Sequence, residues 1–180
     1  MKAKEVMQSL IGSEFNEEFK VKIVNQKGVR SHYNRLLKCI FIDLDKDKNN
    51  KKGECTAFYH EIGHHIDNVN KLSSRRLFGR LILRDCEDLI HIIDMLKENI
   101  SINPYMHGLS DILSGATNNV YALKYSHSNE YWDLGPHKLS SEAFAHFYEA
   151  YIRNDIKKIN LYRTYLPRAF SLFLNMVKYI

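Results

Sequence analysis

The alternation of apolar and polar residues predicts two strands near the start of the chain. Phe19–Val24 alternates apolar with basic side chains, as a half-exposed strand does. Leu37–Asp43 is more densely apolar and predicts a more buried strand. The charged run Asp45–Lys52 that follows predicts a solvated loop. A short helix is expected over residues 3–11.

Apolar residues at helical spacing dominate the remainder of the chain. They predict helices at residues 54–69, 85–97, 140–153 and 167–177. The third of these begins with serines suited to capping, and the last has a proline in its first turn. Residues 99–138 show no clear period and contain prolines and glycines. Strands followed mainly by helices predict an α+β fold with a small sheet.

The composition is typical of a folded globular chain and narrows the candidate functions. Hydrophobic residues make up 44% and charged residues 26%. Residues 1–180 contain no repeat, low-complexity segment or linker, so a single domain is expected. The net charge of +5 is modest, and no motif of stacking aromatic and basic residues appears, which makes nucleic acid an unlikely partner.

Cysteine usage and hydropathy indicate where the protein works. The three cysteines are odd in number and form no CxxC pair, which favours a reducing compartment. No signal peptide is visible, and no apolar run approaches the roughly 20 residues that cross a bilayer. We therefore expect a cytoplasmic protein without membrane segments.

The candidate chemistry lies in the predicted helix 54–69, where the chain reads HEIGHHID from His60 to Asp67. His60 and His64 are four residues apart, so their imidazoles share one helix face and suit a zinc ion. Glu61 can lean over the ion without binding it and accept a proton from a water that the ion acidifies. The competing interpretation is an ordinary helix carrying surface histidines and a glutamate.

Two further residues of this segment bear on that choice. Gly63 costs the helix on the order of 1 kcal/mol relative to alanine, which indicates close approach of another element. His65 points away from the face of His60 and His64 and is not expected to bind the ion.

A catalytic zinc needs a third protein ligand, and the sequence offers two candidates. A ligand after a glycine turn is excluded, because Asp67 and Asn70 occupy the positions of the glycine and the ligand. The segment Gly108–Gly115 offers Asp111, and the predicted helix 140–153 offers Glu142. Spacing alone leaves both open.

HEIGHHID followed by SSEAFAHFYEA (140–150) resembles the zincin metallopeptidases whose third ligand is a helix-borne glutamate, a group that includes the catalytic domain of anthrax lethal factor. A closer similarity is to predicted metallopeptidase domains associated with phage minor-capsid and head-morphogenesis proteins and with mobile elements. Ser110–Ile112, Gly115–Thr117 and Tyr125–Trp132 match their intervening motifs. The resemblance covers roughly residues 35–175.

This resemblance implies a zincin-like domain in which the helix 54–69 faces the helix 140–153. It implies one zinc ion bound by His60, His64 and Glu142. It also implies that Glu61 is the general base. Asp67 would orient a ligand imidazole through its second nitrogen.

The chain departs from these families at two positions. His146 stands where a second acidic residue is frequent, and Gly135 stands where the lethal-factor group has a tyrosine that stabilises the oxyanion. That role passes to His127 and Tyr131, with His137 as a further candidate. The competing interpretation of Tyr131-Trp132 is a packed aromatic pair.

The expected function is a zinc-dependent peptidase, encoded by a phage or mobile element, that hydrolyses a protein or peptide substrate. An extended substrate would pair with Leu37–Asp43 or with its edge neighbour. The alternative is a non-catalytic phage structural or interaction module stabilised by a zinc site. Glu61 favours the enzyme, because a purely structural site does not need it. If a phage encodes the protein, it would be associated with the virion as well as located in the cytoplasm.

Overall fold

The computed structural model describes residues 20–24, 31–121 and 123–178. Within this part of the chain, three strands form one small sheet, and their bounds are β1 Lys20–Ile23, β2 His32–Asn34 and β3 Cys39–Ile42. The strand order is β1-β3-β2, with β1 parallel and β2 antiparallel to β3. The central strand β3 is therefore paired on both sides, whereas β2 is an outer strand.

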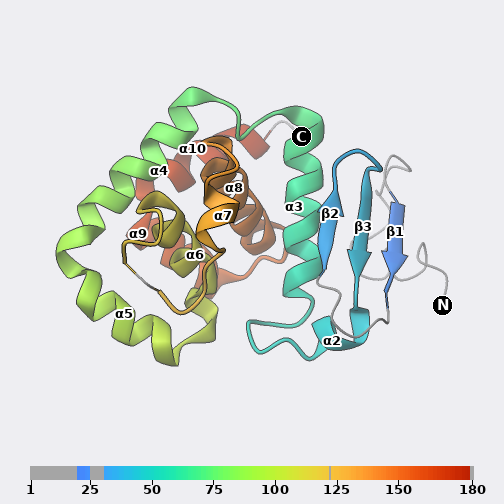
Figure 1. The fold of residues 1–180 in the computed structure, drawn as a ribbon, viewed down its shortest axis with the longest axis horizontal. Coiled ribbons are helices and arrows are strands. Elements are labelled where there is room, and N and C mark those ends of the chain that lie inside the picture. Colours follow the sequence, from blue (N-terminus) through green and yellow to red (C-terminus); the bar gives the residue numbers. More distant parts are fainter. Residues whose placement is uncertain (1–19, 25–30, 122, 179–180) are drawn as a thin grey trace.

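Helices follow the sheet and make up most of the molecule (Figure 1). Their bounds are α2 Leu44–Lys48, α3 Thr56–Asn70, α4 Arg76–Leu89, α5 Ile93–Ile102, α6 His107–Ala116, α7 Asn129–Trp132, α8 His137–Ile152, α9 Ile156–Tyr165 and α10 Pro167–Val177, with 3-10 turns η1 at Ile90–Ile92 and η2 at Pro104–Met106. The predicted α+β class, a small sheet followed mainly by helices, is confirmed.

Helix α3 lies between the sheet and the helical body (Figure 1). On one side, its residues Phe58 and Ile62 pack with Ile40 of β3 in a small apolar cluster. On the other side α8 runs so close that a Cβ on Gly63 would lie 2.7 Å from the Ala145 Cα. Gly63 therefore permits the close approach that the sequence predicts. The two helices that carry the candidate metal ligands are in direct contact.

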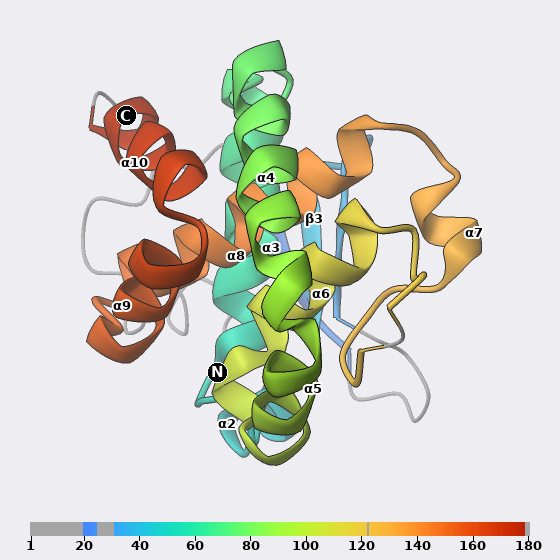
Figure 2. The ribbon, with the colours of Figure 1, turned by 90° about the vertical axis from the view of Figure 1, so that its left-hand side faces the viewer.

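The main hydrophobic core lies on the far side of α3 and α8 from the sheet. It is built around fully buried aromatic rings of α4, α8 and α10, among them Phe78, Phe147 and Phe170. Each such ring contributes roughly 1.5–3 kcal/mol by burial. Figure 2 shows α4 and α5 following one another along the face of the molecule opposite the sheet. This core holds α8 rigidly behind α3.

The predicted loop Asp45–Lys52 is wrong in its first part, where α2 forms. Asp47 is buried instead of solvated, and its carboxylate accepts the backbone N–H groups of Ala57 at 2.9 Å and Phe58 at 2.8 Å. Cys55, which precedes α3, provides no side-chain cap. Asp47 therefore caps α3 from a distance, and the turn of α2 brings it there.

Other predicted boundaries differ as well. The expected helix 85–97 is two helices, α4 and α5, joined by a 3-10 turn, and residues 99–138 contain α6 and α7. Helix α8 starts before the serines expected to cap it, so Ser140 and Ser141 lie buried inside the helix. The expected helix 3–11 lies outside the described residues. None of the described helices has the length and apolar character of a membrane span.

Candidate metal centre

Two histidines of α3 and one glutamate of α8 bring two ring nitrogens and both oxygens of one carboxylate together. The Nε2 atoms of His60 and His64 are 3.1 Å apart. Glu142 places Oε2 at 3.1 Å from the His60 nitrogen and Oε1 at 3.3 Å from the His64 nitrogen. Ligands of a tetrahedral zinc ion, bound at about 2.0–2.1 Å, lie roughly 3.3 Å from one another. The three side chains therefore already have the spacing of a metal site.

The protonation chemistry of these atoms also fits a cation. When both imidazoles are neutral, two ring nitrogens and a carboxylate converge with too few hydrogens to satisfy them all. Burial would raise the pKa of Glu142, but His64 and His60 outweigh it and hold that pKa well below its usual range. Glu142 is thus an anion despite being 1% exposed. A buried anion and two imidazoles are a suitable donor set for a divalent metal ion.

A hydrogen-bonded chain orients the His64 ring. Its Nδ1 lies 3.2 Å from the Ser141 hydroxyl, which donates to Asp67 at 3.4 Å and accepts from Arg35 at 3.1 Å. Asp67 therefore reaches the imidazole through Ser141 rather than directly, and its shorter contacts, both 2.6 Å, are to Ser73. Such outer partners fix which nitrogen of a histidine faces the metal.

Glu61 is attached to the sheet. The backbone N–H of Tyr33, in β2, donates to its Oε2 at 2.8 Å. This carboxylate is buried and lines two cavities, of about 440 and 230 Å³. His65, as expected, turns away from His60 and His64 and contacts the Tyr33 hydroxyl at 3.0 Å.

Tyr131 and His127 lie next to Glu142. The Tyr131 hydroxyl donates to Oε1 of Glu142, and its ring stacks on His127 with 4.1 Å between ring centroids. Burial and the charge of Glu142 raise the pKa of this hydroxyl, which keeps it a proton donor. Tyr131 also packs edge-on against Trp132 at 5.2 Å, so the two sequence interpretations of this pair are compatible. His137 lines neither cavity.

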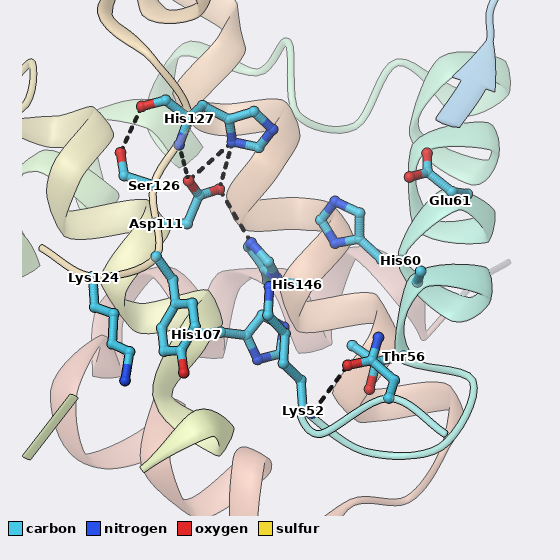
Figure 3. A pocket seen from close by; sticks show the side chains of 13 residues that line it. Lys52, Thr56, His60, Glu61, His107, Asp111, Lys124, Ser126, His127 and His146 are labelled. Carbon is cyan, nitrogen blue, oxygen red and sulfur yellow. Dashed lines mark hydrogen bonds and ion pairs between the residues drawn. The ribbon is translucent and has the colours of Figure 1, made fainter. Parts of the chain in front are cut away.

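Asp111, the rival third ligand, is also buried but has different neighbours. Its carboxylate accepts from His127 Nδ1 at 2.9 Å and faces His146 Nε2 at 3.3 Å (Figure 3). Burial would raise the pKa of Asp111, but these two imidazoles lower it to about 2. Glu142, by contrast, meets both histidines of the motif. His146 is within 4.8 Å of the ligand atoms of His60 and Glu142, so it is a neighbour of the centre that sequence reasoning did not assign.

Two cavities open beside these residues. The first, about 440 Å³, is lined by residues of α3, α6 and the segment before α7 (Figure 3). The second, about 230 Å³, lies against β2 and contains His64, Tyr131 and Glu142. His60, Glu61 and His127 line both. His60 is therefore the ligand that the two cavities share, whereas His64 and Glu142 line only the smaller one.

The chain matches no known protein family, no curated protein and no solved structure. The similarity to glutamate-type zincins remains a prediction from the sequence motifs. What the described residues establish is narrower: buried histidines and carboxylates are positioned to hold a metal ion.

Proposed function

We propose that this chain is a zinc-dependent peptidase with its centre at His60, His64 and Glu142. The observation that carries this proposal is the convergence of three side chains near a buried carboxylate at Glu61: the two imidazole nitrogens are 3.1 Å apart, and each faces one oxygen of Glu142, at 3.1 and 3.3 Å. Two imidazoles and one carboxylate form the ligand set of many catalytic zinc sites, which keep one further position open.

Zinc bound there would polarise the scissile carbonyl and make a nearby water acidic enough to react at neutral pH. Glu61 would then act as the general base, taking a proton from the attacking water and returning it to the leaving amine. The Tyr33 N–H fixes one oxygen of Glu61 and so aims the carboxylate. The Tyr131 hydroxyl, whose single proton here goes to Glu142, would turn to donate to the oxygen that gains charge. The His127 ring faces the same cavity and would donate through the nitrogen that does not contact Asp111.

The substrate would bind as an extended strand along β2. The first candidate for this role, the strand predicted at Leu37–Asp43, is excluded, because β3 is paired on both sides. Its edge neighbour β2 lies against α3 and forms part of the wall of the smaller cavity through His32 and Tyr33. A peptide added to β2 would lie beside Glu61, and pairing with the Tyr33 N–H would compete with the hydrogen bond of that N–H to Glu61.

One observation favours the alternative, a non-catalytic module stabilised by zinc. A structural zinc site is closed by four protein ligands, and His146 is close enough to His60 and Glu142 to be considered as a fourth. Nε2 of His146 contacts Asp111, so this ring would have to bind the ion through Nδ1.

The substitution Glu61→Gln separates the two functions. It preserves size and hydrogen bonding but removes the basic carboxylate, so we expect full metal content and a 10²–10⁴-fold loss of cleavage. The assay incubates zinc-loaded protein with a peptide library prepared from a cell proteome and identifies new termini by mass spectrometry, with self-cleavage scored in parallel. The matched control is Glu87→Gln, at an exposed position on α4. Termini that appear equally with the wild type and Glu61→Gln would favour the zinc-stabilised module.

A further inference from the structure

Behind the candidate centre lies a second group of ligand-type residues that the proposed reaction does not use. It consists of His107, the first residue of α6, and of His146 and Glu149 from α8. All three are at least 95% buried, and one ligand atom from each lies within 4.8 Å of the other two. Figure 3 shows His146 between His107 and Asp111, with His60 to one side.

Each imidazole of this group has one nitrogen already committed as a donor. His107 Nδ1 lies 3.2 Å from the Pro104 carbonyl oxygen, which can only accept. His146 Nε2 lies 3.3 Å from the ionised carboxylate of Asp111, which also only accepts. Neutral rings oriented in this way present His107 Nε2 and His146 Nδ1 as bare acceptors. Histidines that bind metals have this arrangement, with the second nitrogen donating to a carbonyl or carboxylate.

Glu149 also presents a bare acceptor. Its Oε1 accepts from Lys158 at 2.5 Å and from Arg153 at 3.3 Å. Its Oε2 faces His107 Nε2 at 3.6 Å and has no hydrogen bond. His146 Nδ1 is likewise buried without a partner. Three acceptors thus face one another, and none of them makes a hydrogen bond to a donor, an arrangement that is costly unless a cation or water lies there.

An ion pair of protonated His107 with Glu149 would be the alternative to a metal. Burial lowers the pKa of His107, and although Glu149 opposes this, the lowering prevails, with Lys158 adding to it. Because Nδ1 faces the Pro104 carbonyl and must carry the proton there, a neutral His107 ring presents Nε2 as an acceptor opposite the Glu149 oxygen.

We propose that His107 Nε2, His146 Nδ1 and Glu149 Oε2 bind a second divalent ion of the zinc type, independent of the first centre. Two imidazoles and a carboxylate suit zinc and its neighbours in the transition series. The present spread of up to 4.8 Å exceeds the roughly 3.3 Å of tetrahedral ligands, so the side chains close on the ion when it binds. The ion would join α6 to α8 directly behind His60.

Tyr162 supplies the fourth polar atom of the site. Its hydroxyl is fully buried and lacks a hydrogen bond. A Cβ on Gly108 would collide with this hydroxyl and would approach His146 Nδ1 to 3.0 Å, so both atoms lie against the same glycine. The positive charges of Lys158 and Arg153 repel a cation, and we therefore expect this site to bind more weakly than the first.

The test measures metal per chain by elemental analysis after equilibration with excess zinc and desalting. We expect two ions in the wild type, one in the His60→Ala/His64→Ala variant, one in His107→Gln and none when all three changes are combined. The control is His91→Gln, an exposed histidine, which should keep two. Each variant tests its own site. If His107→Gln keeps the wild-type content, the second site is wrong; if the double variant keeps it, the proposed catalytic centre is wrong.

A measurement on the wild type alone covers the case in which a variant does not fold. Metal-free protein is titrated with Co²⁺, and the visible absorption of the bound ion is followed. Saturation at two equivalents supports the second site. Saturation at one equivalent overturns it, because the first centre accounts for one ion and the buried acceptors are then satisfied by water only.

Discussion

At the scale of single residues, Glu142 and Asp111 are buried carboxylates with different neighbours. Glu142 contacts both histidines of the motif, whereas Asp111 contacts His127 and His146. We therefore expect Glu142→Gln to weaken zinc binding by more than the 10–100-fold typical of a lost outer partner, and Asp111→Asn to leave zinc binding at the first centre nearly unchanged. Competition with a chromogenic chelator measures both. The reverse ranking would move the third ligand to Asp111.

A substitution at Tyr131 tests a hydrogen-bond donor of the proposed active site without removing a metal ligand. Its hydroxyl donates to Glu142 and faces the cavity where the carbonyl of a substrate would lie. Tyr131→Phe keeps the ring stacked on His127, so metal content should remain at the wild-type level. Loss of one hydrogen-bond donor to the developing oxyanion should lower kcat by roughly 10²–10³-fold.

The check on Tyr131→Phe uses a peptide that the wild type is found to cleave. Tyr105→Phe, on the exposed 3-10 turn η2, serves as the matched control. An unchanged kcat in Tyr131→Phe would reduce Tyr131 to a packing residue beside Trp132.

The residues of the candidate site differ in how readily the sequence predicts them. His60, Glu61 and His64 follow from helical spacing, a local property of the chain. Ser141 and Arg35 could not be predicted to meet, because the contact joins positions 106 residues apart and depends on how α8 docks. Ser141 adjoins Glu142 in sequence, but its serine was interpreted as a helix cap.

At the scale of elements, the contact between α3 and α8 depends on Gly63. A Cβ there would lie 2.7 Å from the Ala145 Cα and 3.0 Å from its carbonyl oxygen, both backbone atoms that cannot turn aside. Gly63→Ala should therefore force the helices apart and lower the free energy of unfolding by roughly 1–3 kcal/mol, with a loss of zinc affinity because the ligands separate. Chemical denaturation and zinc titration measure the two effects.

Gly79→Ala, on α4, is the matched control for this change. A Cβ at Gly79 would approach only the side-chain oxygen of Ser140, at 2.9 Å, and a hydroxyl can rotate. Alanine also favours a helix by about 1 kcal/mol over glycine. If the two variants lower the free energy of unfolding equally, the close contact of Gly63 with Ala145 does not explain the effect.

Helices and strands can be predicted from the sequence where a local hydrophobic pattern determines them. Helix α10 begins at Pro167 and ends at Val177, as its pattern predicts, and β1 and β3 fall within their expected runs. The strand β2 was missed, because its three residues, His32 to Asn34, are not apolar and extend only by pairing with β3. The short α2 was missed because its charges resemble a solvated loop while Asp47 is turned inward to cap α3.

At the scale of the whole molecule, the buried carboxylates make stability depend on acidity. The pKa of Asp111 is lowered to about 2, and those of Glu142 and Glu149 are also lowered. A lowered pKa means that the folded state favours the ionised form, so this stabilisation is complete above the ordinary pKa near 4 and is lost as pH falls below it. His64, whose pKa is raised, is protonated in both states there and contributes nothing to the change.

The pKa of buried His146 is lowered to about 3 and that of His107 is also lowered, so the unfolded chain takes up protons at these two positions first and stability starts to fall below the ordinary histidine pKa near 6.5. We therefore expect the melting temperature of the metal-free chain to fall from about pH 6.5 down to pH 2. Circular dichroism in the presence of a chelator follows this transition. Asp111→Asn should melt at a lower temperature at neutral pH and lose less stability in acid, because the contribution of the Asp111 carboxylate to the pH dependence is removed. A melting temperature that is constant over this range would contradict the proposed charge network.

The separation of the metal ligands along the chain has a consequence for how the protein matures. His60 and Glu142 are 82 residues apart. At a synthesis rate of roughly 5–20 residues per second, Glu142 leaves the ribosome on the order of 4–16 seconds after His60. During this interval the nascent chain offers only two of the three ligands. Tight capture of the ion must therefore wait until α8 has been made and has docked on α3, so the growing chain is without its proposed hydrolytic activity while most of it is being synthesised.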